Sequence, residues 1–182
     1  MIKNTLLVIL GLIVLAILII ALMASQRPDT FRVSRSASIA APAEKIFPMI
    51  NNMCEFDTWN PYSRKDPQMK SSYSGPPSGL GARSDFEGKK AGTGSLEVVQ
   101  ATPPSEVKMR LSMTAPFKGD NSVVFTLAPQ GSSMQATQAT WAMEGAAPFV
   151  ARFMGVIFNM DKMVGADFEA GLSNLKTKAE KS

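Results

Sequence analysis

An uninterrupted apolar stretch near the amino terminus restricts the fold of this chain more than any other feature. Residues Thr5–Ala24 read TLLVILGLIVLAILIIALMA and contain neither a charged residue nor a proline. As a helix, these 20 residues rise by about 1.5 Å each and reach about 30 Å, the thickness of the hydrocarbon core of a bilayer. The stretch therefore predicts one transmembrane helix rather than a helix packed inside a soluble core.

A cleaved secretory signal is the alternative interpretation of this stretch, because Lys3 places a basic residue ahead of it. The apolar run is longer than the roughly 7–15 residues of a signal-peptide core. The exit sequence Ala21–Gln26 also lacks a clean pair of small residues at cleavage spacing. Both details favour an uncleaved anchor.

The side of the membrane is less constrained by the sequence. Lys3 lies before the apolar stretch and three arginines follow it, so the positive-inside count is contradictory. We favour a short cytoplasmic tail, which places the rest of the chain outside the cytoplasm, in the periplasm. The single cysteine, Cys54, cannot form an internal disulfide that would indicate an oxidising compartment.

The remaining chain has the length of one domain. We expect residues 1–29 to form the anchor and a short linker, and residues 30–182 to form a single domain of about 150 residues. The formal net charge is +4, but the basic residues are scattered among acids, with doublets only at Arg64-Lys65 and Lys89-Lys90. This pattern is typical of a solvated surface, so no nucleic-acid partner is expected. The oligomeric state is open.

The order of predicted elements is strand, short helices, a run of strands and a long helix. Alternating apolar residues predict a strand over 31–39, and Pro42 in a first turn begins a helix that should end near Asn51-Asn52, with a brief turn at 55–59. Apolar residues spaced by three or four predict one long amphipathic helix over 148–178. Between them, turn signals separate the predicted strands of an antiparallel meander: Ala82–Glu87, Gly94–Ala101, Val107–Met113, Ser122–Leu127 and Met134–Met143.

Several short motifs occur in the same order as in a known superfamily. They are Ile39–Phe47, Trp59–Ser63, Asp66–Met69, Tyr73–Pro76, Gly79–Ala82, Thr140–Gly145 and Met160–Lys176. Over residues 31–180 the chain resembles the SRPBCC superfamily of START-like, helix-grip proteins, which includes START lipid-transfer domains, pollen allergens and the polyketide cyclase/dehydrase-like group. The resemblance implies an α+β fold in which a curved antiparallel sheet wraps around a long C-terminal helix. Such folds host several functions, so the resemblance alone does not select one.

The sequence lacks the residues that several kinds of metal, catalytic and cofactor site require. The chain has no histidine and one cysteine, so neither a transition-metal site nor a familiar hydrolase constellation can be assembled, and no cofactor is expected. Gly79/Gly81 and Gly92/Gly94 do not continue to a dinucleotide-binding motif. Four carboxylates are candidate acid–base groups, although exposed strand edges and turns are the more ordinary explanation for them: Asp85 and Glu87 on one strand face, and Asp57 and Asp66 in the loops near Trp59.

The apolar composition favours a cavity. Twelve methionines and ten phenylalanines are present, and flexible methionine suits the wall of a pocket that adapts to its ligand, as well as any loosely specified core. Alternate strand positions and one helix face supply the candidate lining, and the superfamily geometry places Trp59 and Tyr62 at its entrance. The full candidate set is Trp59, Tyr62, Phe86, Met109, Leu111, Met113, Phe125, Trp141, Met143, Phe153, Ile157 and Met160.

We therefore expect a membrane-tethered, noncatalytic binding domain that holds a lipid or other hydrophobic small molecule between the sheet and the C-terminal helix. A cyclase or dehydratase is the first alternative, in which the pocket folds a reactive substrate and one carboxylate or tyrosine moves a proton. An interaction module with a filled core is the second. The sequence names neither the ligand nor a catalytic residue.

Overall fold

The structure is a computed structural model that describes residues 2–131 and 135–181. It divides into two compact units. One comprises the residues up to Phe31 together with Ala146–Met160, and the other comprises Arg32–Gly145 and the residues from Asp161 onwards. Each unit is described by itself below.

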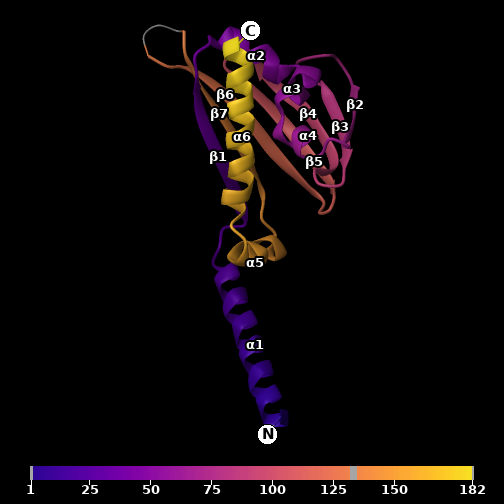
Figure 1. The fold of residues 1–182 in the computed structure, drawn as a ribbon, viewed down its shortest axis with the longest axis vertical. Helices are drawn as coiled ribbons and strands as arrows, with labels where there is room; N and C mark the ends of the chain where they lie inside the picture. Colours follow the sequence, from indigo (N-terminus) through magenta and orange to yellow (C-terminus); the bar gives the residue numbers. More distant parts are fainter. Residues whose placement is uncertain (1, 132–134, 182) are drawn as a thin grey trace. The chain divides into compact units, whose positions relative to one another are not determined.

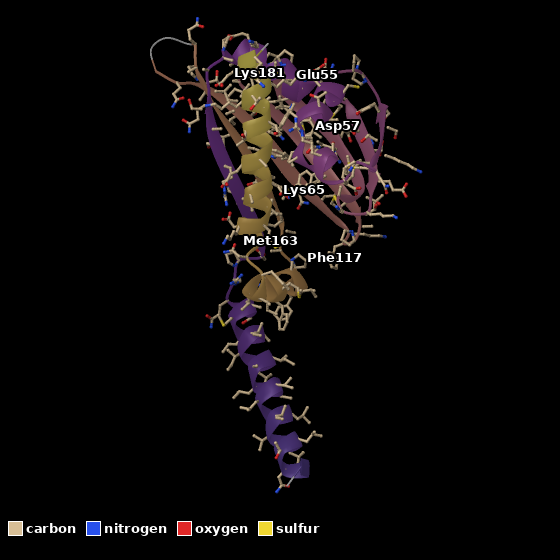
Figure 2. All side chains as sticks on the ribbon, viewed as in Figure 1. Glu55, Asp57, Lys65, Phe117, Met163 and Lys181 are labelled. Atoms are coloured by element: carbon tan, nitrogen blue, oxygen red, sulfur yellow. The ribbon has the colours of Figure 1, made fainter. Side chains whose placement is uncertain are left out.

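The first unit contains the apolar helix. Helix α1 (Ile2–Ser25) covers the predicted span and extends it slightly at both ends. The span Asn4–Ser25 contains an 18-residue window with a mean hydropathy of 3.5, and none of that window is buried. The side chains of the helix are drawn in Figure 2. Length and composition allow it to cross a membrane, as an anchor or as a signal sequence near the N-terminus. The unit also contains the short helix α5 (Phe149–Ile157).

The second unit contains a seven-stranded antiparallel sheet, with the strand order β1-β7-β6-β5-β4-β3-β2. Consecutive strands from β2 onwards are neighbours, as the predicted meander requires, and β1 closes onto β7 (Figure 1). The strands are β1 (Thr30–Ile39), β2 (Lys70–Ser74), β3 (Arg83–Gly88), β4 (Gly92–Thr102), β5 (Glu106–Ala115), β6 (Gly119–Pro129) and β7 (Thr137–Ala146).

Two strand predictions need comment. Strand β2 was not predicted, because its sequence KSSYS has no apolar alternation and all five residues are exposed. It is an edge strand that pairs with β3. The last strand was predicted to begin at Met134, which lies outside the described residues, and β7 begins at Thr137.

Three short helices connect β1 to β2. Helix α2 (Ala43–Asn51) contains Pro48 and ends where the sequence predicted. Helices α3 (Met53–Trp59) and α4 (Pro61–Lys65) each begin at an asparagine cap: Asn52 Oδ1 accepts from Cys54 N at 3.0 Å, and Asn60 Oδ1 accepts from Tyr62 N at 3.1 Å. A side-chain oxygen at the N-cap position accepts a hydrogen bond from a backbone amide that the first turn of a helix leaves unpaired. The two asparagine caps therefore explain why two new helices begin within so few residues.

The single helix predicted over 148–178 is wrong. The structure has α5 and a separate helix α6 (Met160–Lys181), because Phe158 adopts an extended conformation with φ −111° and ψ 130°. Asn159, a residue favoured at helix starts, directly precedes α6. The apolar spacing of three to four residues continues through the break, so the periodicity could not reveal it.

Helix α6 crosses one face of the sheet and approaches it closely (Figure 1). The α6 side chains Phe168, Leu172 and Leu175 are buried. A Cβ at Gly171 would lie 2.5 Å from Trp141 Cζ3, and a Cβ at Gly165 would overlap the Arg35 guanidinium. Both glycines allow the helix to make these contacts.

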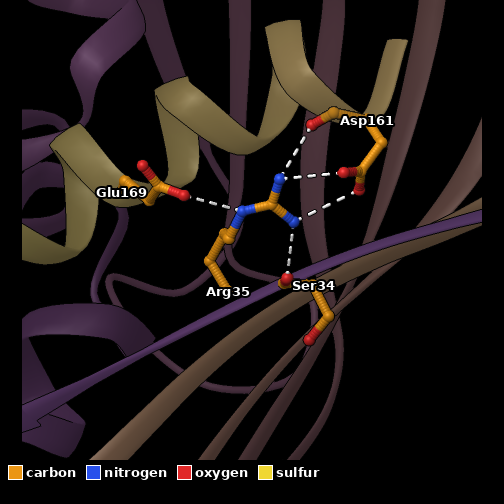
Figure 3. A network of polar contacts seen from close by, with 4 residues as sticks. All are labelled: Ser34, Arg35, Asp161 and Glu169. Carbon is orange, nitrogen blue, oxygen red and sulfur yellow. Dashed lines mark hydrogen bonds and ion pairs between the residues drawn. The ribbon is translucent and has the colours of Figure 1, made fainter. Parts of the chain in front are cut away.

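Arg35 of β1 fixes the start of α6 (Figure 3). Its guanidinium donates to Asp161 Oδ2 at 3.0 Å, to the Asp161 carbonyl oxygen at 3.0 Å and to Glu169 Oε1 at 2.8 Å. These contacts lower the pKa of Asp161, mainly through the hydrogen bond from Arg35. A charged residue of β1 therefore holds the N-terminal part of α6.

Candidate functional site

A cluster of five aromatic side chains lies between the sheet and the helices, and three of its members, Phe56, Trp141 and Phe168, border a cavity. Trp141 of β7 stacks on Phe168 of α6, with ring centroids 4.3 Å apart and an interplanar angle of 9°. Phe125 of β6 lies 4.9 Å from Trp141 on the other strand of the pair. Phe56 and Trp59 of α3 complete the cluster through edge-to-face contacts with both.

Beside this cluster the second unit encloses a cavity of about 200 Å³. Most of its wall is apolar, and the polar side chains are few. Polar groups are contributed by Asp57, Asn60, Tyr62 and Ser84. The apolar lining is Phe56, Met69, Phe86, Ala91, Leu96, Leu111, Met113, Val123, Trp141, Met143 and Phe168.

The alternation of the strands explains how the sheet contributes to this wall. On β5, Val107, Met109, Leu111 and Met113 share one face, as the sequence predicted. Leu111 pairs with Leu96 of β4 across the sheet, and both line the cavity. The cavity is therefore bounded by side chains that point from the inner face of the sheet.

Two polar side chains of the wall are held by hydrogen bonds outside it. Asp57 Oδ2 accepts from the Tyr73 hydroxyl at 2.7 Å. Asn60 caps α4, and Asn174 of α6 donates to the neighbouring carbonyl of Trp59 at 3.0 Å. Burial, and then the nearby charge of Asp167, raise the pKa of Tyr62 well above its usual range. Its phenol therefore stays protonated and can donate a hydrogen bond at neutral pH.

The two tryptophans differ in their hydrogen bonding. Trp59 Nε1 donates to the Met49 carbonyl oxygen at 2.8 Å. Trp141 Nε1 is buried and has no partner among the described residues. Leaving a buried donor unpaired costs about 1–3 kcal/mol, and Trp141 is a residue of the cavity wall.

The other candidate carboxylates have structural contacts. Asp66 Oδ2 accepts from Lys90 N at 2.7 Å and from Ala91 N at 3.4 Å, and the first of these bonds is the main cause that lowers its pKa. Asp85 is paired with Arg83 at 2.6 Å, which lowers the pKa of Asp85. Neither residue lines the cavity, nor does Glu87; of the four carboxylates, Asp57 alone does.

The twelve candidate lining residues fall into three groups. Six line the cavity: Tyr62, Phe86, Leu111, Met113, Trp141 and Met143. Trp59, Met109 and Phe125 face the same interior but are fully buried in packed core. Phe153 and Ile157 lie on α5 in the other unit, and the side chain of Met160 lies outside the described part. Met69, Ala91, Leu96, Val123, Phe56 and Phe168 were missed as lining.

Some of the missed residues carried a usable signal. Val123 and Phe125 alternate on β6, so naming Phe125 should have included Val123. Phe168 lies on the predicted helix stripe, one turn from Leu172. Met69 and Ala91 lie in turns, where no periodicity indicates which way a side chain points.

No group of three or more potential metal ligands occurs among the described residues. The candidate site consists of the cavity, its apolar wall and its few polar groups.

A curved antiparallel sheet crossed by a C-terminal helix, with a cavity between them, defines the helix-grip class of α+β domains. Comparison with protein families supports this class: the profile of the family described as "Polyketide cyclase / dehydrase and lipid transport" matches residues 30–180. The chain belongs to this family, an SRPBCC-type family as the motifs predicted. No curated protein sequence matches the chain.

Solved structures share the fold at low sequence identity. Protein CV1439 from Chromobacterium violaceum is 16% identical, with a TM-score of 0.58 over 85% of this chain and 99% of that chain. Ara h 8.0201 is 8% identical, with a TM-score of 0.57 over 84% of this chain and 99% of that chain. The di-domain ARO/CYC BexL from the BE-7585A biosynthetic pathway is 15% identical, with a TM-score of 0.57 over 87% of this chain and 52% of that chain. These similarities establish the fold alone.

Proposed function

We propose that this protein is a membrane-tethered binding domain for a hydrophobic small molecule or lipid, held in the cavity between the sheet and α6. The largely apolar cavity is the observation that carries the proposal. Burying apolar ligand surface in such a cavity is favourable by about 25 cal/mol per Å² before association costs. A filled core, as an interaction module would have, is disfavoured by this empty volume.

The size of the cavity restricts the ligand. Its volume of about 200 Å³ is below the roughly 300–1,000 Å³ of pockets that bury a drug-sized molecule. The ligand is therefore a small apolar molecule or one segment of a longer lipid. The wall also includes Met113 and Met143, whose unbranched and flexible side chains can adjust to several ligand shapes.

Polar groups of the wall give the ligand one preferred orientation. The Tyr62 phenol is a protonated donor, and Trp141 has a buried N–H without a partner in the described part of the chain. A ligand with a single acceptor, such as a carbonyl or ether oxygen, satisfies one of these donors while its apolar part contacts the remaining wall. Buried polar groups placed in this way set orientation more than affinity.

The tether in this proposal is α1, with the domain outside the cytoplasm. An apolar ligand dissolves in the bilayer, so a domain fixed beside the bilayer meets it at a higher effective concentration than a freely diffusing domain does. This advantage is the functional reason to keep a spanning helix on a ligand-binding domain.

A cyclase or dehydratase is the second candidate, and one observation favours it. Asp57 and Tyr62 both line the cavity, which brings one carboxylate and one protonated phenol to the same bound molecule. Such a pair can supply a base and an acid for a proton transfer. BexL, which shares the fold, is described as a di-domain ARO/CYC protein. The variant Asp57→Asn separates the two functions: a binding domain keeps its ligand, whereas an enzyme of this kind loses turnover.

The binding proposal is tested by filling the cavity. The intact protein is extracted from membranes in mild detergent, and bound small molecules are identified by native mass spectrometry. Ala91 lines the cavity, so Ala91→Leu should abolish the bound species. Ala170 is exposed on α6 and lies outside the wall, so Ala170→Leu is the matched control and should keep it. Equal ligand content in both variants, or no ligand in the parent after incubation with bilayer lipids, would contradict the proposal.

A further inference from the structure

The helix α5 is apolar, yet it buries none of its residues. Its sequence FVARFMGVI has one charged residue, Arg152, and no acid. Four of its large apolar side chains are well exposed: Phe149 by 45%, Val150 by 68%, Met154 by 44% and Ile157 by 54%. Soluble domains rarely expose this many large apolar side chains to water on about two and a half turns of helix.

The exposed side chains share one face of α5. At 100° per residue, Phe149, Val150, Met154 and Ile157 fall within one half of the helix circumference. The opposite half carries Ala151, Arg152 and Gly155. The helix is therefore amphipathic, and the polar groups of its less apolar half are the Arg152 side chain and the backbone.

That opposite half is attached to the chain that leaves α1. Arg27, two residues beyond the end of α1, donates from Nη1 to the Gly155 carbonyl oxygen at 2.7 Å. Arg152 in turn donates a hydrogen bond from Nη1 to the Arg27 carbonyl oxygen at 3.0 Å. Ala147, just before α5, donates its backbone N–H to the Asp29 carbonyl oxygen at 2.6 Å.

These bonds fix the depth of α5 once α1 spans a bilayer. An arginine directly after an apolar span lies at the boundary between hydrocarbon and water, because its guanidinium reaches for the headgroups. A helix bonded to that arginine lies at the same boundary. Its attached half faces the chain exit, so its apolar half is free to enter the acyl region.

We propose that α5 is an interfacial helix, whose apolar face of Phe149, Val150, Phe153, Met154 and Ile157 is covered by the lipid surface around α1. Helices that lie in the interface have this make-up: a broad apolar face with aromatic residues, opposite a short basic face. The inference rests on the proposed tether and adds to it a second point of membrane contact.

Fluorescence quenching by lipids measures this contact in the full chain. Cys54, the only cysteine and exposed, is replaced by serine. An environment-sensitive NBD label is then placed singly at Val150→Cys, Met154→Cys or Ala151→Cys, and at Leu15→Cys in the middle of α1. The labelled proteins are reconstituted in phosphatidylcholine/phosphatidylglycerol vesicles that carry a doxyl quencher near the headgroup or near the chain end. Both leaflets carry the quencher, so the result does not depend on orientation.

Labels at residues 150 and 154 should emit at shorter wavelength and be quenched several-fold more by the shallow than by the deep doxyl lipid. The label at residue 151 is the matched control on the opposite, exposed side and should be quenched weakly by both. A blue shift at 150 and 154 without lipid quenching would mean that a protein partner covers the face, which overturns the proposal.

The label on α1 separates the two hypotheses. Deep quenching at residue 15 with equal, weak quenching at 150, 151 and 154 would refute the interfacial helix while the tether stands. Absence of deep quenching at residue 15 would refute the tether, and the interfacial helix with it.

Discussion

On β5, Val107 and Met109 are fully buried, whereas Leu111 and Met113, further along the same face, border a cavity. The two halves of this face have the same alternation and nearly the same composition. They differ in what covers them. Helix α2 contacts β5 and β6 and buries Ile46 there, so the packed end is closed by apolar side chains.

The cover of the hollow end is of another kind. Beside Phe56 of α3 and Phe168 of α6, it includes the polar side chains Asp57, Asn60 and Tyr62 and the residues Met69 and Ala91 at turns. Turns and capping residues have backbone groups to satisfy and cannot interdigitate as an apolar helix face does. The same strand face therefore becomes core at one end and a cavity wall at the other, and the difference is made by the covering elements.

Two methionines of one strand test this comparison with the largest expected effect. Met109→Ala removes a fully buried side chain from the packed end and should lower the free energy of unfolding by about 2–5 kcal/mol. Met113→Ala only enlarges an existing cavity and should cost roughly 1 kcal/mol. Urea unfolding of both variants gives the two values. Equal losses would show that the cavity end is packed as tightly as the other.

Adding volume should have opposite signs at the two ends. Ala139→Leu places three extra carbons in packed core and should destabilise the protein by about 1–3 kcal/mol. Ala91→Leu adds the same atoms to the cavity and should stabilise the ligand-free protein by about 0.5–2 kcal/mol. Thermal unfolding of delipidated samples measures both. A loss of stability at Ala91 would mean that the volume there is not available to a side chain.

The distance between α6 and the sheet is tested at Gly171. Gly171→Ala should gain about 1 kcal/mol from helix propensity. The added Cβ clashes with Trp141 and Pro61, which should cost about 1–3 kcal/mol. We therefore expect the free energy of unfolding to fall by about 1 kcal/mol. At Gly119 nothing lies within 4 Å of an added Cβ, so Gly119→Ala is the control and should be nearly neutral. Chemical denaturation compares them, and equal behaviour would argue against close packing of the helix.

The smallest effect is expected from acid, at the turn beside the cavity. Hydrogen bonds from Lys90 N and then Ala91 N favour the charged form of Asp66 and hold its folded pKa below the usual value of about 4. Its contribution to stability is therefore complete above the unfolded pKa and is lost as pH falls through the lower, folded pKa. The stability difference between the parent and Asp66→Asn should shrink below about pH 4. A difference that is constant from pH 6 to pH 3 would contradict this role.

Alternation and turn signals predicted the strands well, because β5 and its neighbours have one apolar and one polar face. The same signals could not separate Met109 from Met113, since both point inward and only the position of α2 distinguishes their surroundings. They also missed the break at Phe158, where the apolar spacing continues across an extended residue. The motifs predicted the fold, but the lining residues Met69 and Ala91 come from turns, whose side-chain directions depend on tertiary contacts.

Trp59 and Trp141 are the chain's two tryptophans, and their ring centroids lie 5.9 Å apart at an interplanar angle of 81°. Two identical chromophores this close share their excited states, so the pair should give a coupled circular-dichroism band that isolated indoles lack. Trp141 borders the cavity and stacks on Phe168 of α6. Trp59 donates a hydrogen bond to the Met49 carbonyl oxygen near the end of α2. Ligand entry, loosening of the helix and melting of the packed end should therefore each change this band, which makes it an optical reporter that needs no label.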